Sequence, residues 1–465
     1  MTLRAPTLGK RTKWALLAGT AFAAGLIWQP AYRAIAGRVV PSAFAQVRGD
    51  NKLKLIELFG DVFEEVRADY VEPTKDRDMI ENAINGMLTG LDPHSSYMNE
   101  KAWKEMQVTT HGSFGGLGIE VTQEAGYIKV ISPIDDTPAA RAGIKAGDMI
   151  LSLDGQTVQG LTLNDAVDRM RGPAGGKIVL QIKRDHVDKP IEVSMVREVI
   201  QVQVVKSHLE GEIGYIRLSS FNENSDSEVR KAYRQLTTKL GHRMAGVVLD
   251  LRNNPGGLLD QAIAVSDDFI DQGEIVSTRA RNPAESQRWD AHGGDITNGL
   301  PMTVLINEGS ASASEIVAGA LQDHRRAVMV GERSFGKGSV QTVIPLSPGN
   351  GAMRLTTARY YTPSGRSIQG LGISPDVPVQ ATRVAEAHVG VEHEADYNHI
   401  LTNSGGTAPA AAPPRTDLPP IAHGIPKLPP EGFATFDPAK PETDFQLQQA
   451  LVLVRSMVAN QHAAK

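Results

Sequence analysis

Cysteine is absent from this sequence, and the chain carries no long run of lysine or arginine. The missing thiols exclude disulfide bonds, a thiolate nucleophile and cysteine-ligated zinc. A formal net charge of only −5 argues against a general nucleic-acid binder. What remains is a chain of 465 residues with 41% apolar content, which is enough to bury more than one core. We therefore expect two or more globular domains.

The N-terminus also lacks an apolar run of transmembrane length. Residues 14–28 are nearly uncharged, but they fall short of the roughly 20 residues that a membrane-spanning helix needs. A basic segment precedes this run, and the small-x-small sequence at 43–45 has the form of a signal-peptidase site. The pattern predicts that residues 1–45 are a signal peptide or an N-terminal anchor. The mature protein is then exported to the bacterial periplasm or to the periplasmic face of the inner membrane.

The most informative stretch runs from residue 303 to residue 341. Apolar residues at 303–306 and 327–330 predict two buried strands, and 313–321 between them has the apolar spacing of a helix. The serines of the turn before that helix, Ser310 and Ser312, and Ser314 beside them stand where helix N–H groups stabilise developing negative charge. Lys337 follows between two glycines. The residues alone also fit a simple helix cap with a solvated lysine, and they do not choose among the three serines.

A family resemblance makes that choice. The sequence SASASE, with a lysine in SFGKGSVQ 25 residues after its second serine, resembles the active-site signature of the carboxyl-terminal processing peptidases, which are S41 serine proteases. The resemblance implies that Ser312 is the nucleophile, Lys337 the general base and Gln341 the residue that orients the lysine. It also implies an α/β core of the ClpP/crotonase-like type at 198–385, with no metal and no cofactor.

A second glycine-rich turn belongs to the same predicted core. The continuous apolar run at 245–251 is typical of a strand covered on both faces, and a turn of sequence NNPGG follows it. Repeated strand–turn–helix units predict a parallel sheet, which would bring this turn and the serine turn to the same edge. The family resemblance then implies that an N–H group of Gly256 or Gly257, together with that of Ala313, forms the oxyanion hole.

Residues 111–197 differ from their surroundings, with short alternating strands and many glycines. The segments FGGLGI, PAARAGI and GDMILSLDG resemble a bacterial PDZ domain inserted into the chain. Such a domain binds a peptide as an added strand and holds its terminal carboxylate in a nest of backbone N–H groups. The expected peptide-binding residues are the loop and the facing helix: Gly116, Leu117, Gly118, Ile119, Leu163, Val167 and Met170.

The remaining segments are assigned from periodicity and composition. Residues 46–110 are predicted to be helical, with an apolar stripe along 51–70. Residues 386–440 are rich in proline, alanine and glycine and are expected to be a flexible linker. A final helix is predicted within 441–465, and it packs on the core or on a partner.

Taken together, the motifs predict an exported serine endopeptidase that recognises C-terminal regions of protein substrates and cleaves through an acyl-enzyme. A base that works as neutral lysine requires that Glu315, Asp323 and Glu332 point away from Lys337. Two alternatives stay open: a serine hydrolase with a triad of His324 and Asp323, and a non-catalytic PDZ scaffold or chaperone. Expected partners are proteins or peptides with apolar C-termini. An adaptor protein and a homo-oligomer are left open, and nucleic acid is not expected.

Overall fold

The computed structural model describes residues 42–124, 126–383, 393–403, 415–437 and 440–463. Most of the predicted signal peptide or anchor therefore lies outside the described residues. The described chain forms two compact units, which divide after Ala83.

The N-terminal unit is helical, as predicted. Helix α2 spans Ser42–Asp69, and α3 spans Asp76–Thr89, starting in this unit and continuing into the next. Leu55, Leu58 and Val62 on the predicted apolar stripe are more than half exposed. None of the helices in the described part of the chain is long and apolar enough to cross a membrane.

The core of the second unit is a six-stranded sheet, ordered β10-β11-β12-β15-β16-β19. From β11 to β19 every neighbouring pair is parallel, which confirms the parallel sheet predicted from the repeated strand–turn–helix units. Only β10 runs antiparallel at its edge. The strands are β10 (Val205–Glu210), β11 (Ile213–Leu218), β12 (Gly246–Asp250), β15 (Met302–Ile306), β16 (Val328–Gly331) and β19 (Val377–Pro378).

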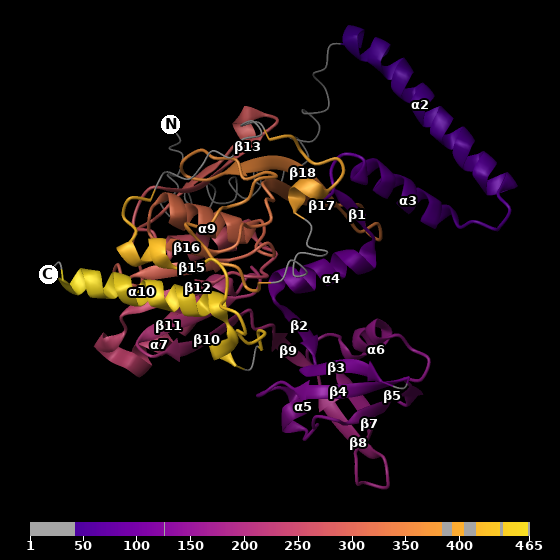
Figure 1. Ribbon diagram of the computed structural model, residues 1–465. Helices are drawn as coiled ribbons and strands as arrows, with labels where there is room; N and C mark the ends of the chain where they lie inside the picture. Colours follow the sequence, from indigo (N-terminus) through magenta and orange to yellow (C-terminus); the bar gives the residue numbers. More distant parts are fainter. Residues whose placement is uncertain (1–41, 125, 384–392, 404–414, 438–439, 464–465) are drawn as a thin grey trace, which may run out of the picture. The chain divides into compact units, whose positions relative to one another are not determined.

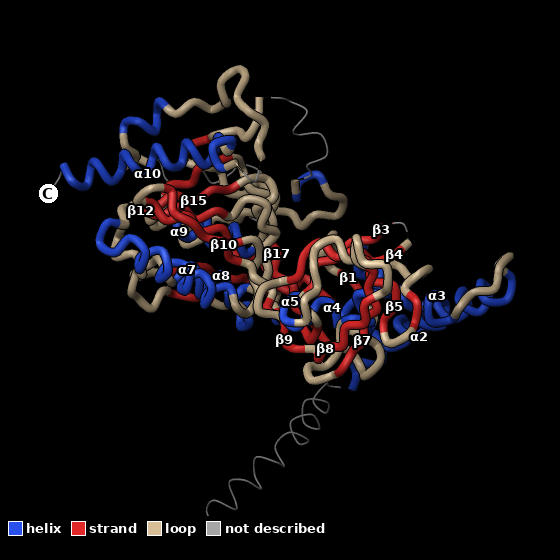
Figure 2. Tube along the Cα trace, turned by 90° about the horizontal axis from the view of Figure 1, so that it is seen from below, coloured by secondary structure: helices blue, strands red, loops and turns tan. Residues whose placement is uncertain are grey.

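Both faces of this sheet are covered, because alternate residues of each strand point to opposite sides. Val247 and Val304 pack in the core cluster that includes residues of α7 (Ser225–Leu240), α8 (Leu259–Asp267) and α9 (Ala313–Asp323). Val248 and Leu305, one residue further along, pack instead against α10 (Phe445–Ala463). Figures 1 and 2 show α10 along one side of the sheet, and Figure 2 shows α7 and α8 on the other. The C-terminal helix thus completes the core.

A second, antiparallel sheet lies in the same unit, and the sequence analysis did not anticipate it. Its strands are ordered β1-β18-β13-β14, with β17 also paired to β18. Strand β1 precedes the PDZ segment in the chain and β18 follows it, so the PDZ domain is inserted into the core. The strands are β1 (Ser96–Met98), β13 (Glu274–Ala280), β14 (Arg288–Asp290), β17 (Ser339–Pro345) and β18 (Ala352–Tyr361).

The inserted domain is a small β-rich fold with its own core. Its main sheet has the order β3-β4-β5-β7-β8, with β6 on β5, and β2 pairs separately with β9. Strand β3 is therefore an edge strand. The elements are α4 (Glu100–His111), which leads into the domain, β2 (Ser113–Gly116), β3 (Ile119–Glu124), β4 (Tyr127–Pro133), α5 (Pro138–Arg141), β5 (Met149–Leu153), β6 (Gln156–Thr157), α6 (Leu163–Met170), β7 (Lys177–Lys183), β8 (Ile191–Val196) and β9 (Glu198–Gln201).

The segment expected to be a flexible linker differs from that prediction over residues 415–437. Arg415 forms buried contacts with Asp376 and with the carbonyl oxygen of Ala327. Ala422, in a short 3-10 helix (Pro420–Gly424), is buried in the cluster beneath α10. The composition resembled a linker, but scattered apolar and charged side chains anchor this part of the chain to the core.

Candidate active site

Two turns meet at the carboxyl ends of the neighbouring strands β12 and β15, as the sequence predicted. The N–H of Ala311 in the second turn donates to the carbonyl of Asn254 in the first, at 3.0 Å. The side chains of Asn253 and Asn307 also connect the turns, through the Asn307 amide nitrogen and the Asn253 Oδ1 at 2.8 Å. The serine turn is therefore held rigidly against the NNPGG turn.

The three candidate serines have different surroundings. The hydroxyls of Ser310 and Ser314 are fully buried and donate to the carbonyl oxygens of Leu251 and Asn254, at 2.8 and 2.9 Å. Ser312 is partly exposed at the start of α9 and has a φ of 54°, a strained value for a residue with a side chain. Of the three, only Ser312 has a hydroxyl that donates to no backbone carbonyl among the described residues.

Gly256 allows the two turns to approach closely. A Cβ atom on Gly256 would lie 2.9 Å from the Cβ of Ser312 and 3.0 Å from the nitrogen of Ala313. Its own N–H donates to the Asn254 side chain at 2.9 Å. The N–H groups of Gly257 and Ala313, in contrast, donate to no acceptor among the described residues. The free pair of donors beside Ser312 is thus Gly257 and Ala313, while Gly256 supplies space.

Glu315 connects the serine turn to the loop between β16 and β17, which carries Lys337 and is called the lysine loop below. Its buried carboxylate accepts hydrogen bonds from the backbone N–H groups of Ser312 and Lys337, at 2.8 and 2.9 Å. It also accepts from the Ser334 hydroxyl and the Gly336 N–H. Burial raises the pKa of Glu315 to about 7, although these hydrogen bonds oppose the shift.

The requirement that acidic side chains avoid the lysine is wrong for Glu315. Its carboxylate is close enough to act on Lys337 electrostatically, and it acts to raise the pKa of the lysine. The reason is geometric: four donors from two loops need one common acceptor, and a carboxylate provides enough lone pairs. Asp323 does point elsewhere, because it pairs with Arg366 and Ser364.

Lys337 has the electrostatic environment that a general base needs. Burial is the main influence that lowers its pKa below the ordinary value, and the positive charge of Arg354 adds to it. The carboxylates of Glu394, Glu315 and Asp92 act in the opposite direction. The net shift favours the neutral amine, which is the form that can accept a proton.

Tyr360 joins Ser312 to the lysine loop from β18. Its hydroxyl donates to the carbonyl oxygen of Lys337 and forms a side-chain hydrogen bond with Ser312. Burial raises the pKa of Tyr360 well above its ordinary value, so the hydroxyl keeps its proton. The sequence analysis missed this residue, because a tyrosine near the end of a strand gave no signal beyond that of an ordinary core position.

Gln341 lies four residues beyond Lys337, on β17. Its amide nitrogen donates to the hydroxyls of Ser339 and Thr356, at 2.9 and 3.1 Å. No hydrogen bond between Gln341 and Lys337 occurs in the described structure, so the orienting role of Gln341 stays a prediction.

Comparison with known proteins shows the family of this chain. Residues 212–379 match the model of peptidase family S41, residues 115–195 match a PDZ domain, and residues 19–102 match the "Activating protease CtpB N-terminal domain". A carboxy-terminal-processing protease of Bartonella bacilliformis is 52% identical over 89% of this chain and 91% of its own length. The chain belongs to the carboxy-terminal-processing proteases of family S41.

Two further similar proteins have related names. The carboxy-terminal processing protease CtpA of Bacillus subtilis is 36% identical, over 71% of this chain and 70% of its own. The solved structure of a photosystem II D1 C-terminal processing protease is 31% identical, covers 76% of this chain and 92% of its own, and has a TM-score of 0.41. The family-model matches and the 52% identity to the Bartonella protease show that this protein is a serine protease with a PDZ domain.

The alternative triad of His324 and Asp323 does not fit this S41 protease. Ser312 precedes the first residue of α9, and His324 follows its last, so eleven helical residues separate them. That helix is roughly 16 Å long at 1.5 Å per residue. His324 also contacts the carbonyl oxygen of Glu274 at 2.6 Å. The histidine therefore lies far from the serine.

The PDZ residues singled out from the sequence fall into two groups. The N–H groups of Leu117 and Gly118, between β2 and β3, donate to no acceptor among the described residues. The side chain of Leu117 is buried in the PDZ core, and so is that of Met170, which differs from the groove-lining position expected for Met170. Leu163 and Val167 on α6 stay half-buried.

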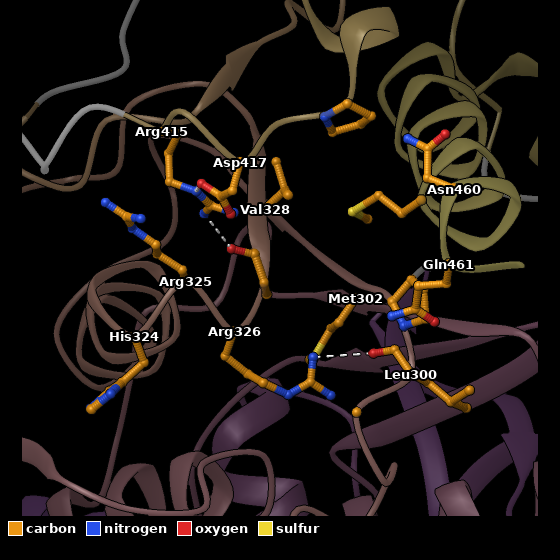
Figure 3. A pocket seen from close by; sticks show the side chains of 15 residues that line it. Leu300, Met302, His324, Arg325, Arg326, Val328, Arg415, Asp417, Asn460 and Gln461 are labelled. Atoms are coloured by element: carbon orange, nitrogen blue, oxygen red, sulfur yellow. Dashed lines mark hydrogen bonds and ion pairs between the residues drawn. The ribbon is translucent and has the colours of Figure 1, made fainter. Parts of the chain in front are cut away.

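A separate pocket lies at the amino ends of β15 and β16, whereas the serine turn and the NNPGG turn lie at the carboxyl ends of their strands (Figure 3). It has a volume of about 450 Å³, and three arginines and His324 contribute to its lining. Arg326 pairs with Asp295 and Arg415 with Asp376 and Asp417, so most of this positive charge is already compensated.

Proposed function

We propose that this protease is an exported endopeptidase that uses Ser312 as nucleophile, Lys337 as general base and Gln341 as the group that orients the lysine. The observation that carries the proposal is the difference among the three serines: the Ser310 and Ser314 hydroxyls donate to backbone carbonyl oxygens, whereas the Ser312 hydroxyl donates to none among the described residues. Ser312 is also linked to the lysine loop through the Glu315 carboxylate.

The chemical steps follow from these positions. Neutral Lys337 takes the hydroxyl proton of Ser312 while the serine oxygen attacks the carbonyl carbon of the scissile peptide bond. The oxyanion that forms is held by the N–H groups of Gly257 and Ala313. Lys337 then gives its proton to the leaving amine, and the acyl-enzyme remains. Water, deprotonated by the same lysine, hydrolyses the ester and restores the serine.

The PDZ domain is proposed to select substrates by their C-termini. The free N–H groups of Leu117 and Gly118 suit a terminal carboxylate, and the edge strand β3 suits a peptide added as a further strand. Proteins with apolar C-terminal residues are the expected substrates. Export is proposed from the N-terminal sequence, whose basic residues and apolar run have signal-peptide form.

The test is time-resolved proteolysis of an unfolded reporter, combined with labelling by a serine-directed acylating reagent. Ser312→Ala and Lys337→Ala should both abolish cleavage, and Ser312→Ala should remove the label. Ser314→Ala is the control, and the folded enzyme should retain most of its activity. Cleavage that survives Ser312→Ala would refute the proposal, and a wild-type protein without any cleavage would favour the non-catalytic scaffold.

A further inference from the structure

A network of side chains connects the turn that precedes β1 to Gln341. Asp92 in that turn is 3% exposed. Its Oδ1 accepts from the N–H groups of His94 and Ser95, both at 2.9 Å, and its Oδ2 accepts from the Ser95 hydroxyl at 2.7 Å. A fourth donor reaches Oδ1 from β18, the hydroxyl of Thr356 at 3.0 Å.

The donors to Asp92 favour its ionised form. Burial acts to raise the pKa of Asp92, but the four hydrogen bonds outweigh it and bring the pKa below its ordinary value. An ionised carboxylate only accepts hydrogen bonds. Thr356 must therefore donate its single hydroxyl proton to Asp92. The Thr356 oxygen can then only accept further hydrogen bonds.

This polarity determines which end of the Gln341 amide faces Thr356. A hydroxyl oxygen whose proton is already used can accept from the amide nitrogen but cannot donate to the amide oxygen. The Gln341 nitrogen accordingly donates to Thr356 and, with its second hydrogen, to the buried Ser339. Both hydrogens of the Gln341 amide therefore form hydrogen bonds, and the Gln341 Oε1 has no partner among the described residues.

The strand register supports the same arrangement. Gln341 and Thr356 are direct cross-strand partners, whereas Val340 pairs with Ala358. Thr357 is therefore the extra residue of a β-bulge on β18, which places Thr356 opposite Gln341. Thr357 itself is exposed and bonds to Thr342 at 2.7 Å.

We infer that Asp92 and Thr356 are positioning residues, which hold the Gln341 amide with its oxygen free to accept a hydrogen bond from Lys337. In the opposite orientation the amide would donate an N–H to the lysine nitrogen. That hydrogen bond would occupy the lone pair that must take the proton of Ser312. The inference rests on the proposed roles of Ser312, Lys337 and Gln341.

The experiment is a double-mutant cycle between Thr356 and Gln341, measured as kcat/KM for peptide cleavage and as the rate of Ser312 acylation. Thr356→Val keeps the branched shape and removes the hydroxyl, and it should lower both rates by roughly tenfold, a fraction of what general base catalysis contributes. Thr356→Ser should restore them. If Thr356 acts through Gln341, Thr356→Val should have no further effect in a Gln341→Ala background.

Thr357→Val is the matched control, because it makes the same change at the next residue and outside the network. Asp92→Asn does not replace Thr356→Val in the cycle, because it also removes a negative charge that acts directly to raise the pKa of Lys337. Where Thr356→Val fails to fold, Thr356→Ala compared with Thr356→Ser gives the same contrast. The inference would be overturned if Thr356→Val cleaved and acylated at wild-type rates. It would also be overturned if Thr356→Val lowered the rates equally with Gln341 and with Gln341→Ala. Acylation that persists in Ser312→Ala would instead refute the catalytic proposal itself.

Discussion

The carboxylate of Glu315 accepts a hydrogen bond from the backbone N–H of Lys337 at 2.9 Å. The same oxygen accepts from the N–H of Ser312 at 2.8 Å, so one buried side chain fixes the backbone of both the proposed nucleophile and the proposed base. A glutamate three residues into a helix commonly caps its N-terminus. Here the capping residue also binds a loop 22 residues away.

Glu315→Gln should disrupt this junction, although it changes the size of the side chain very little. The carboxylate serves four donors, and an amide nitrogen in place of one oxygen would face two of them without accepting. Buried donors left without an acceptor cost roughly 1–3 kcal/mol each. We expect a lower unfolding midpoint and a loss of cleavage, measured by thermal unfolding and by peptidase assay. A variant with wild-type stability and rate would show that the four contacts are not required.

The pH dependence of cleavage should report the charge around Lys337. The lysine acts as base only after it loses its proton, so activity should be low in acid and rise through the pKa of Lys337, below the ordinary value near 10.4. Removing the positive charge of Arg354 with Arg354→Met should raise this pKa and move the rise to higher pH. Removing the negative charge of Glu394 with Glu394→Gln should move it to lower pH.

These two variants form a matched pair, because they remove charges of opposite sign that act on the same amine. The measurement is kcat/KM across the pH range for both variants and the wild type. Shifts in the same direction, or none, would mean that another group controls the rise in activity.

The C-terminal helix should contribute to stability through a buried ion pair. Arg252, next to the NNPGG turn, contacts Asp250 on β12 and Asp444 at the start of α10, both at 2.6 Å. Asp444→Asn removes one of the two carboxylates that pair with Arg252, and Asp250 remains as its partner. Denaturant unfolding should therefore show a loss below the roughly 3–5 kcal/mol expected when a buried charge is left without any partner. Glu442→Gln, an exposed carboxylate two residues earlier, is the control and should change the stability little.

The sequence predicted those parts of the site that depend on local pattern. The apolar runs of β12 and β15 and the turns that follow them are contiguous in the chain, so their meeting at one sheet edge could be inferred from the parallel topology. The choice of Ser312 came from family spacing and stays a prediction, which the hydrogen bonds of the Ser310 and Ser314 hydroxyls to backbone carbonyls support.

Other parts could not be inferred from local pattern. Asp92 and Thr356 stand 264 residues apart and meet only because β1 pairs with β18 across the inserted PDZ domain. The bulge that sets Thr356 opposite Gln341 depends on strand register, which no run of apolar residues specifies. The described segment 415–437 has the composition of a linker, and only the contacts of Arg415 and Ala422 show that it is packed.

The PDZ domain should distinguish a free C-terminus from a blocked one. The N–H groups of Leu117 and Gly118 donate to no acceptor among the described residues. Gly118 also has no room for a side chain, because a Cβ atom there would lie 2.3 Å from the Cβ of Thr137. A peptide that ends in a carboxylate after Val, Ala or Leu should bind better than its C-terminal amide. A substrate with that tail should also be cleaved faster.

A substitution on α6 tests whether the PDZ domain binds the C-terminus of the substrate or only restricts access to the protease core. Leu163 is half-buried and is expected to contact the last side chain of the peptide, while its neighbour Asn164 is exposed. Leu163→Ser should weaken binding of the carboxylate peptide and reduce the advantage of the tailed substrate, and Asn164→Ser should do neither. Binding is measured by fluorescence anisotropy and cleavage by a time course, both with the full-length enzyme. Equal cleavage of the carboxylate and amide substrates by the wild type would contradict recognition of the C-terminus by the PDZ domain. A domain that only restricts access to the core would not distinguish the two ends.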